Sequence, residues 1–326
     1  LRDWLARNLE TLGTQLIRPV LELARASGAE SVVLVPCGRL DALPFSAASV
    51  AGSTSLDRPT LSVLPSARYL DSKRPVEADR KALMVANPHH VRRVVLSGVE
   101  LELPLPDLVF ARHECEVLLS LTDPGSAIWL TGTNADLDAV LNYAQDARYI
   151  HLACHGVFDP VDYMSSGLLL SGETRLTLRE IGTKLSFRAS PVVVLSACQT
   201  AISDFAPVHS DMLSLPRALL AAGARGIVSA LWPVADVATA LLIECFWRKH
   251  VGQGLPAGES LALAQRWLRE GSADELGLVR LYESLVVDSR SEGTYVNRIG
   301  YYRTHGAEKP FEDPFFWAGF VYTGNP

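Results

Sequence analysis

The sequence has few cysteines and no long apolar run, and each of these features excludes a class of protein. Five cysteines among 326 residues form an odd set without a Cys-x-x-Cys pair, which argues against a disulfide framework and the common zinc patterns and favours a reducing compartment. No stretch reaches the roughly 18 uncharged apolar residues of a membrane span, and the N-terminus lacks a basic segment followed by an apolar one. These absences predict a soluble, cytoplasmic protein.

The sequence also has no excess of positive charge. Thirty Lys and Arg residues stand against 36 Asp and Glu, and the formal net charge is −6, so nucleic acid is not expected as a directly bound partner. The arginines are scattered through helix-like stretches, as on solvated faces. The chain begins with Leu1 instead of an initiator Met. We therefore expect it to be processed or to be the C-terminal part of a longer chain.

The apolar residues predict an α/β fold with a large core. With 48% hydrophobic and 20% charged residues, disorder is excluded. Short runs rich in Val, Ile and Leu alternate with amphipathic segments, which is typical of parallel strands buried on both faces and joined by helices. The expected strands are residues 31–35, 61–64, 82–86, 127–130, 148–152, 192–196, 226–231 and 315–324, and the expected helices are 111–121, 135–146, 215–223, 235–250 and 258–270.

Two segments are less regular. Residues 2–27 have apolar residues at helical spacing, but Pro19 should kink or divide the helix. Residues 271–312 are polar and contain one helical piece near their start. We interpret them as an extended surface loop, with a role in docking a substrate or partner as the alternative.

Two of the predicted strands end in small residues around a reactive one. Residues 147–156 read ARYIHLACHG and residues 191–200 read PVVVLSACQT. The carboxyl ends of parallel strands share one edge, where such folds place ligands and chemistry, so His155 and Cys198 are expected to face each other there. An imidazole beside a thiol takes its proton or stabilises the thiolate. The N–H groups of Gly156 and Cys198 would form an oxyanion hole.

On the residues alone, a structural role for His155 and Cys198 remains open. Cys154 and His151 lie nearby, but the spacing of the four side chains fits no standard zinc pattern. His151 lies inside an apolar strand and is interpreted as a core histidine. Cys154 is interpreted as a small buried residue. No metal is expected.

The chain resembles a CHAT domain, a family of caspase-like cysteine peptidases related to caspases and separases. The resemblance runs along nearly the whole chain. It is carried by VVLVPCGRLDALPFSA at 32–47, LSVLPSARYL at 61–70, MVANP at 84–88, RHECEVLLSL at 112–121, YIHLACHGVFD at 149–159, VVLSACQTA at 193–201, RALLAAGARGIVSALWPVAD at 217–236 and FWAGFVYTG at 316–324.

The resemblance implies a caspase-like α/β/α sandwich with a mostly parallel central sheet flanked by helices. It implies a division into an N-terminal pseudo-caspase-like half, residues 1–125, and a catalytic half, residues 126–326, that contains the polar insertion 271–312. By the same resemblance, His155 and Cys198 fall on the family's catalytic dyad. The reaction implied is hydrolysis of a peptide bond, without metal or organic cofactor.

The resemblance also suggests a substrate pocket. LWPVAD at 231–236 resembles the separase stretch in which an acidic residue meets a basic side chain before the scissile bond, and Asp236 is the candidate. An Asp at this position is equally suited to cap the following helix. Asp204 and Asp211, after Cys198, are alternatives. The stretch 202–218 lacks the acidic, glycine-containing pattern of many relatives, so details of the activation loop do not transfer.

We therefore expect a cysteine endopeptidase that cleaves a protein or peptide substrate. By analogy, it is regulated by an upstream domain or partner protein and acts in bacterial antiviral defence or stress signalling. The alternative is a catalytically silent caspase-like module that binds peptides or serves as a scaffold. No membrane partner is expected.

Overall fold

The computed structural model describes most of the chain. The described residues are 1–50, 53–54, 60–70, 81–88, 93–102, 105, 108–196, 214–286 and 292–326. Among them, none of the helices combines the length and the apolar character that crossing a membrane requires.

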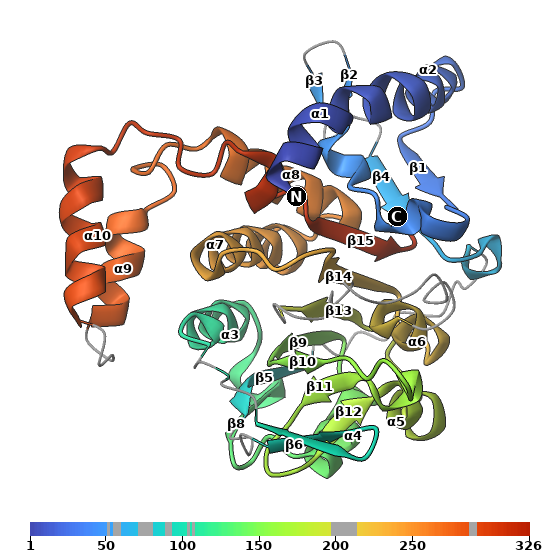
Figure 1. Ribbon diagram of the computed structural model, residues 1–326, viewed down its shortest axis with the longest axis vertical. Helices are drawn as coiled ribbons and strands as arrows, with labels where there is room; N and C mark the ends of the chain where they lie inside the picture. Colours follow the sequence, from blue (N-terminus) through green and yellow to red (C-terminus); the bar gives the residue numbers. More distant parts are fainter. Residues whose placement is uncertain are drawn as a thin grey trace.

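An eight-stranded sheet runs through the centre of the molecule (Figure 1). Every neighbouring pair of its strands is parallel except β14 and β15, which are antiparallel. The strands of one block, β14, β13, β9, β5 and β8, therefore end at one common edge. In spatial order the sheet contains β1 (Ser31–Leu34), β4 (Thr60–Val63), β15 (Phe320–Gly324), β14 (Gly226–Ala230), β13 (Val192–Leu195), β9 (Tyr149–Ala153), β5 (Ala82–Pro88) and β8 (Ala127–Gly132).

The central strands are apolar on both faces because helices cover both faces. All residues of β9 and β13 are buried. Val192 and Val194 belong to the hydrophobic cluster that contains α3, α7 and α8, whereas Val193 and Leu195 belong to the cluster that contains α4, α5 and α6. This confirms the predicted mostly parallel sheet flanked by helices. The helices are α3 (Ala111–Ser120), α4 (Leu137–Ala144), α5 (Leu178–Lys184), α6 (Leu215–Ala221), α7 (Asp236–Trp247) and α8 (Ala257–Glu270).

The N-terminal helical stretch is divided as Pro19 predicts. Helix α1 (Arg2–Leu12) is followed by a wider π-type segment, Gly13–Ile17, and then by α2 (Arg18–Ala26), which carries Pro19 in its first turn. Among the described residues, three small sheets lie outside the central one. They consist of β2 (Ser49–Val50) with β3 (Ser53–Thr54), β6 (Arg93–Leu96) with β7 (Val99–Glu102), and β10 (Gly156–Val157) with β11 (Gly167–Leu169) and β12 (Arg175–Thr177).

The expectation of an extended loop at 271–312 is wrong, apart from the helical piece expected near its start. This stretch contains α9 (Leu278–Val286) and α10 (Glu292–Thr304), which stand side by side at one side of the molecule (Figure 1). Leu278, Leu281 and Leu285 are buried at helical spacing along α9. The polar residues of the stretch cover the other sides of the helices. Their number makes the average composition polar, so the helical spacing of the apolar residues is easily missed. We name this pair of helices the helical hairpin.

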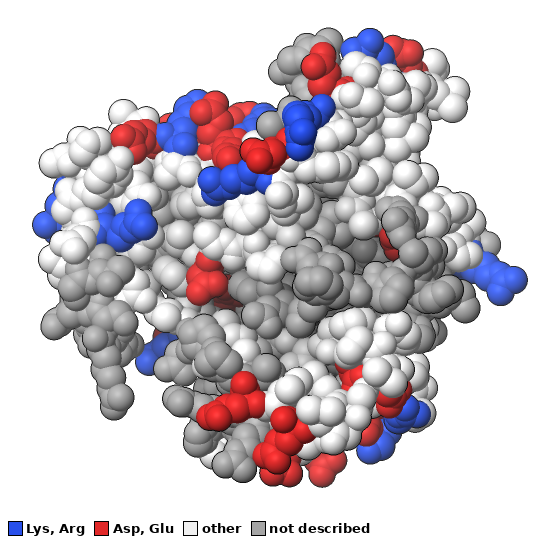
Figure 2. Space-filling view, viewed as in Figure 1, with Lys and Arg blue, Asp and Glu red and all other residues white. Residues whose placement is uncertain are grey.

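Charged side chains on the face drawn in Figure 2 lie mostly toward its outer rim. Described Lys and Arg residues stand there in small groups beside Asp and Glu, and several acidic residues gather over the lower part, where Figure 1 places β6, β12 and α4. This mixed distribution agrees with the interpretation of the arginines as solvated side chains.

Candidate active site

The sheet brings the ends of β9 and β13 to one edge. The two strands are adjacent and parallel, with Leu195 opposite Leu152, and Ser196 N donates to Leu152 O at 3.0 Å. His155 follows the end of β9 by two residues, so it and Ser196 lie at the same edge of the sheet. Cys198 is outside the described residues. The meeting of its sulfur with the His155 ring therefore stays a prediction.

His155 directly precedes the short strand β10, which lies outside the central sheet. His155 is only 5% exposed, and its carbonyl oxygen accepts a hydrogen bond from Leu169 N at 2.7 Å. Gly156 follows in β10, which pairs antiparallel with β11. Gly167 of β11 must be glycine, because a Cβ there would lie 2.3 Å from Leu176 O of β12. The small three-stranded sheet thus fixes the backbone around His155.

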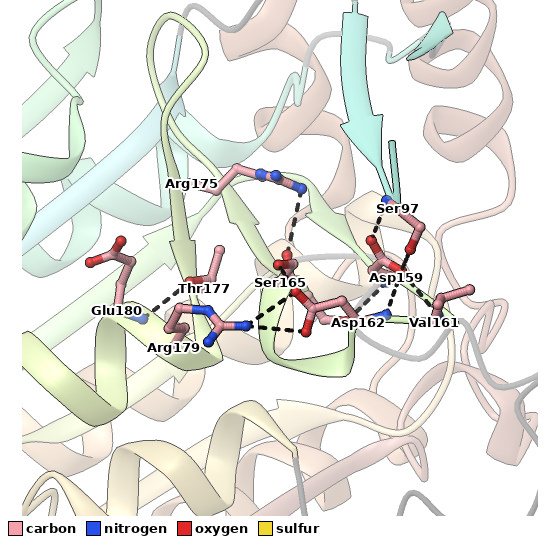
Figure 3. A network of polar contacts seen from close by, with 10 residues as sticks. Ser97, Asp159, Val161, Asp162, Ser165, Arg175, Thr177, Arg179 and Glu180 are labelled. Carbon is pink, nitrogen blue, oxygen red and sulfur yellow. Dashed lines mark hydrogen bonds and ion pairs between the residues drawn. The ribbon is translucent and has the colours of Figure 1, made fainter. Parts of the chain in front are cut away.

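A buried carboxylate, Asp159, organises the loop that follows His155 (Figure 3). Asp159 is 1% exposed and accepts hydrogen bonds from Ser97 N at 2.7 Å, Val161 N at 3.0 Å and Asp162 N at 2.9 Å, as well as from the Ser97 hydroxyl. Burial raises the pKa of this carboxyl, but the hydrogen bonds outweigh burial and the net pKa is lowered. Asp159, four residues after His155, is therefore an ionised carboxylate that holds several backbone N–H groups together.

The donor Ser97 comes from a distant part of the chain. It forms, with Gly98, the two-residue loop between β6 and β7, and both have positive φ, 48° and 80°, as the tight loops of hairpins require. On the other side of the loop, Asp162 accepts a hydrogen bond from Ser165 Oγ at 2.5 Å and pairs with Arg179 at 3.1 Å (Figure 3). The sequence analysis missed Asp159. The only signal was its position before a proline in the His155 stretch, which marks a turn.

His151 and Cys154 lie in the core. His151 is fully buried, and its Nε2 lies 2.9 Å from Glu114 Oε2, although the angle is not that of a hydrogen bond. Cys154 is also fully buried, and burial raises the pKa of its thiol to about 12. A thiol with that pKa stays protonated at neutral pH and is a poor nucleophile. Among the described residues, no three His, Cys, Asp or Glu side chains are arranged to hold a metal ion.

Asp236 lies at the edge where β9 and β13 end. It is the first residue of α7, exposed to solvent, while Ala235 takes the capping position. Asp236 lines a cavity of about 10 Å³ together with Ala153, which ends β9, Ser196, which follows β13, and the buried Glu114 of α3. A cavity of this size holds about one water. Asp204 and Asp211 lie outside the described residues.

Comparison with known proteins gives the following matches. The CHAT domain family model matches residues 6–325, and none of the curated proteins matches. Among solved structures, the chain is similar to the Arg-specific cysteine proteinase gingipain R (RgpB), with 12% identity and a TM-score of 0.43 over 82% of this chain and 54% of that one. It is similar to a complex of the pro- and mature domains of RgpB from Porphyromonas gingivalis, with 10% identity and a TM-score of 0.43 over 85% and 58% of the two chains. The chain thus spans just over half the length of these structures.

The family match covers nearly the whole chain. It includes the central sheet, the His155 loop and Asp236, and it extends through the helical hairpin to the last strand. This confirms the resemblance found in the sequence. The chain belongs to the CHAT domain family.

Proposed function

We propose that this chain is a cysteine endopeptidase that cleaves a protein substrate with His155 and Cys198. The observation that carries the proposal is the position of His155 and Ser196 at the same edge, behind two adjacent parallel strands. Cys198 follows Ser196 by two residues. Acyl transfer requires a nucleophile within hydrogen-bond reach of its base, and two neighbouring strand ends can supply such a pair.

The mechanism needs only groups of the chain and water. His155 takes the proton of the Cys198 thiol, and the thiolate attacks the carbonyl carbon of the scissile bond. The N–H groups of Gly156 and Cys198 stabilise the oxyanion. The C–N bond then breaks as His155 returns its proton to the leaving amine. Water hydrolyses the thioester, with His155 accepting a water proton and Cys198 leaving as the thiol.

We further propose that Asp236 binds a basic side chain that precedes the scissile bond. In support, Asp236 is exposed at the same edge as Ser196 and Ala153 and shares a cavity with them. A carboxylate in such a position pairs well with a guanidinium or ammonium group. Asp204 and Asp211 remain the alternatives. An extended peptide would add backbone hydrogen bonds along the edge.

Control of this activity by an upstream domain or partner protein, and a role in bacterial antiviral defence or stress signalling, are also proposals. They rest on the family resemblance alone. A segment of a second protein is the expected substrate. Proteins that co-purify with the chain are candidate regulators. The cleavage assay below, run with and without them, measures whether such a regulator changes the rate.

The proposal is tested with a peptide library in which every residue before the scissile bond is varied. We expect the wild type to cleave peptides with Arg or Lys at that position. Cys198→Ala and His155→Ala should lower the rate by at least about a thousandfold, whereas Cys154→Ala, the matched control, should cleave at nearly the wild-type rate. Equal cleavage by the wild type and Cys198→Ala would contradict the mechanism. Binding of peptides without cleavage by the wild type would favour the scaffold alternative.

A further inference from the structure

A second cavity lies at the edge of the central sheet opposite to the candidate active site. Its volume is about 240 Å³. Arg148, which directly precedes β9, and Arg225, which directly precedes β14, line it together with Val192, the first residue of β13. These strands are parallel, so their amino ends lie at one edge, whereas His155 and Ser196 follow carboxyl ends at the other. The cavity is therefore separate from the proposed peptidase site.

The main chain fixes both arginines of this cavity at the edge of the sheet. Arg148 O accepts a hydrogen bond from Val192 N at 3.0 Å. Arg225 N donates to Pro191 O at 2.8 Å. The guanidinium of Arg148 also lies over the ring of Tyr149, with its Cζ 5.6 Å from the ring centroid, in a cation–π contact. The two cationic side chains thus start from fixed points on the strands that flank β13.

No acidic side chain balances the positive charge of this cavity. None of the described residues that line it is Asp or Glu. His250 is also part of the wall, and its Nδ1 donates to Leu255 O at 2.7 Å. Burial lowers the pKa of His250, this hydrogen bond opposes the effect, and the charges of Arg148 and Arg225 lower the pKa further. Both guanidinium groups therefore act on the same space, where an anion would be stabilised.

Hydrogen-bond donors form another part of the wall. Ser190, with its hydroxyl, and Ala257, the first residue of α8, both line the cavity. No side chain caps this end of α8, and the first N–H groups of a helix have no acceptor within the helix. The positive end of the helix dipole adds to the attraction of the two arginines for an anion. The wall thus offers several donors to the oxygens of one anionic group.

We propose that this cavity binds a small molecule that carries a phosphate group, with Arg148 and Arg225 on the phosphate oxygens. A phosphate monoester has a charge of about −1.5 to −2 near neutral pH, which matches two guanidinium groups. The planar fork of a guanidinium also donates two parallel hydrogen bonds to phosphate. The volume is below the range of about 300–1,000 Å³ of drug-sized ligands, so the ligand is inorganic phosphate or a small phosphate ester.

Isothermal titration calorimetry tests the proposal with inorganic phosphate, ribose 5-phosphate and unphosphorylated ribose. The buffer contains no phosphate and little salt, because salt screens the charges. Arg225→Gln and Arg148→Gln remove one charge each, and Arg225→Lys keeps the charge without the fork. Arg280→Gln is the matched control, because Arg280 is exposed on α9. Every protein carries a short Gly-Ser extension after Pro326, which lines the cavity, so that no terminal carboxylate competes there.

We expect the wild type to bind one molecule of either phosphate compound per chain and not to bind ribose. Arg225→Gln and Arg148→Gln should each raise the Kd by at least about tenfold, and Arg225→Lys by about three- to fivefold. Arg280→Gln should match the wild type. Tighter binding of ribose 5-phosphate than of inorganic phosphate would identify an organic phosphate as the ligand, and equal binding would identify inorganic phosphate.

Two results would overturn the inference. If the wild type binds neither phosphate compound, the cavity is not a phosphate site. If Arg225→Gln and Arg280→Gln bind equally, the phosphate lies elsewhere on the protein. Thermal unfolding checks that each variant is folded, and Arg225→Gln decides the test if Arg148→Gln does not fold, because Arg225 is exposed. The measurement involves no peptide cleavage, so failure of the proposed peptidase function would leave its outcome unchanged.

Discussion

At the residue scale, burial separates the cysteines by reactivity. Cys115 and Cys154 are fully buried, and burial raises the pKa of both thiols, that of Cys154 to about 12. Cys245 is half-buried with a pKa raised to about 11, also mainly by burial, and Cys37 is exposed. Because the thiolate is the reactive species, the folded protein should resist alkylation at most of these positions.

The first prediction concerns iodoacetamide at pH 8. We expect rapid labelling of Cys37 and, by the proposed mechanism, of Cys198, with slow labelling of Cys245 and none of Cys115 or Cys154. Peptide mass spectrometry after timed quenching measures each rate, and the guanidinium-unfolded chain, in which all five should react, is the control. Rapid labelling of Cys154 in the folded protein would contradict the assignment of that thiol to the core.

The second prediction concerns Asp159. Asp159→Asn keeps the shape of the side chain but loses the charge that several donors face, so we expect a loss of about 1–3 kcal/mol of unfolding free energy at pH 7 and a lower kcat on a cleavable peptide. Because the pKa of Asp159 is lowered in the fold, its contribution is present above the ordinary pKa of about 3.9 and is lost as the pH falls through the lowered value.

Urea unfolding between pH 7 and pH 3 measures this dependence. The unfolding free energy of the wild type should fall more steeply below about pH 4 than that of Asp159→Asn. Asp123→Asn is the matched control, because Asp123 is exposed, and it should follow the wild type. Parallel curves for the wild type and Asp159→Asn would show that the buried carboxylate does not stabilise the loop.

At the scale of elements, the helical hairpin is stabilised by one apolar side of its helices. Leu278 is fully buried, whereas Val296 of α10 is 52% exposed. Leu278→Ala should lower the unfolding free energy by about 2–5 kcal/mol because it leaves a cavity, and Val296→Ala should change it by less than about 0.5 kcal/mol. Urea unfolding followed by circular dichroism measures both. Equal stability of the two variants would mean that the hairpin is not packed on the body.

Elements with a simple apolar pattern were predictable, whereas of this pair of helices only a helical piece at the position of α9 was. The strands β9 and β13 are continuous apolar runs because both of their faces are covered. In residues 271–312, the apolar positions are separated by charged and tyrosine residues, so their average composition resembles a loop. The packing of Tyr282 and Tyr302 in the core explains why a polar segment folds.

At the scale of the whole molecule, β15 joins the two parts of the sheet. It lies between β4 and β14, and the buried Gln265 of α8 holds its start. Gln265 Nε2 donates to Trp317 O at 2.8 Å and to Phe320 O at 2.9 Å. The last strand therefore ties strands from the beginning of the chain to those of the candidate active site.

The fourth prediction is that Gln265→Leu destabilises the whole fold. Two buried carbonyl oxygens lose their donor, which should cost about 1–3 kcal/mol of unfolding free energy. Thermal unfolding should still show one transition, shifted down, when followed by tryptophan fluorescence and by circular dichroism. Gln253→Leu, at an exposed position, should leave the midpoint unchanged. A new early transition confined to one probe would contradict the role of β15 as the link between the two parts.

The sequence by itself determined the α/β class, the chain order of the central strands and of most helices that cover them, the family, and the two strand ends that carry His155 and Cys198. These depend on local patterns, since burial on two faces leaves continuous apolar runs and reactive residues stand out beside them. Tertiary structure decided the rest. It brought the buried Asp159 carboxylate to its hydrogen-bond donor Ser97, 62 positions away, placed Asp236 and Glu114 around one cavity, and brought the ring of Tyr282 against that of Phe110. Such contacts join residues far apart in the chain, and only the folded backbone brings them within the few ångströms over which hydrogen bonds and ring contacts act.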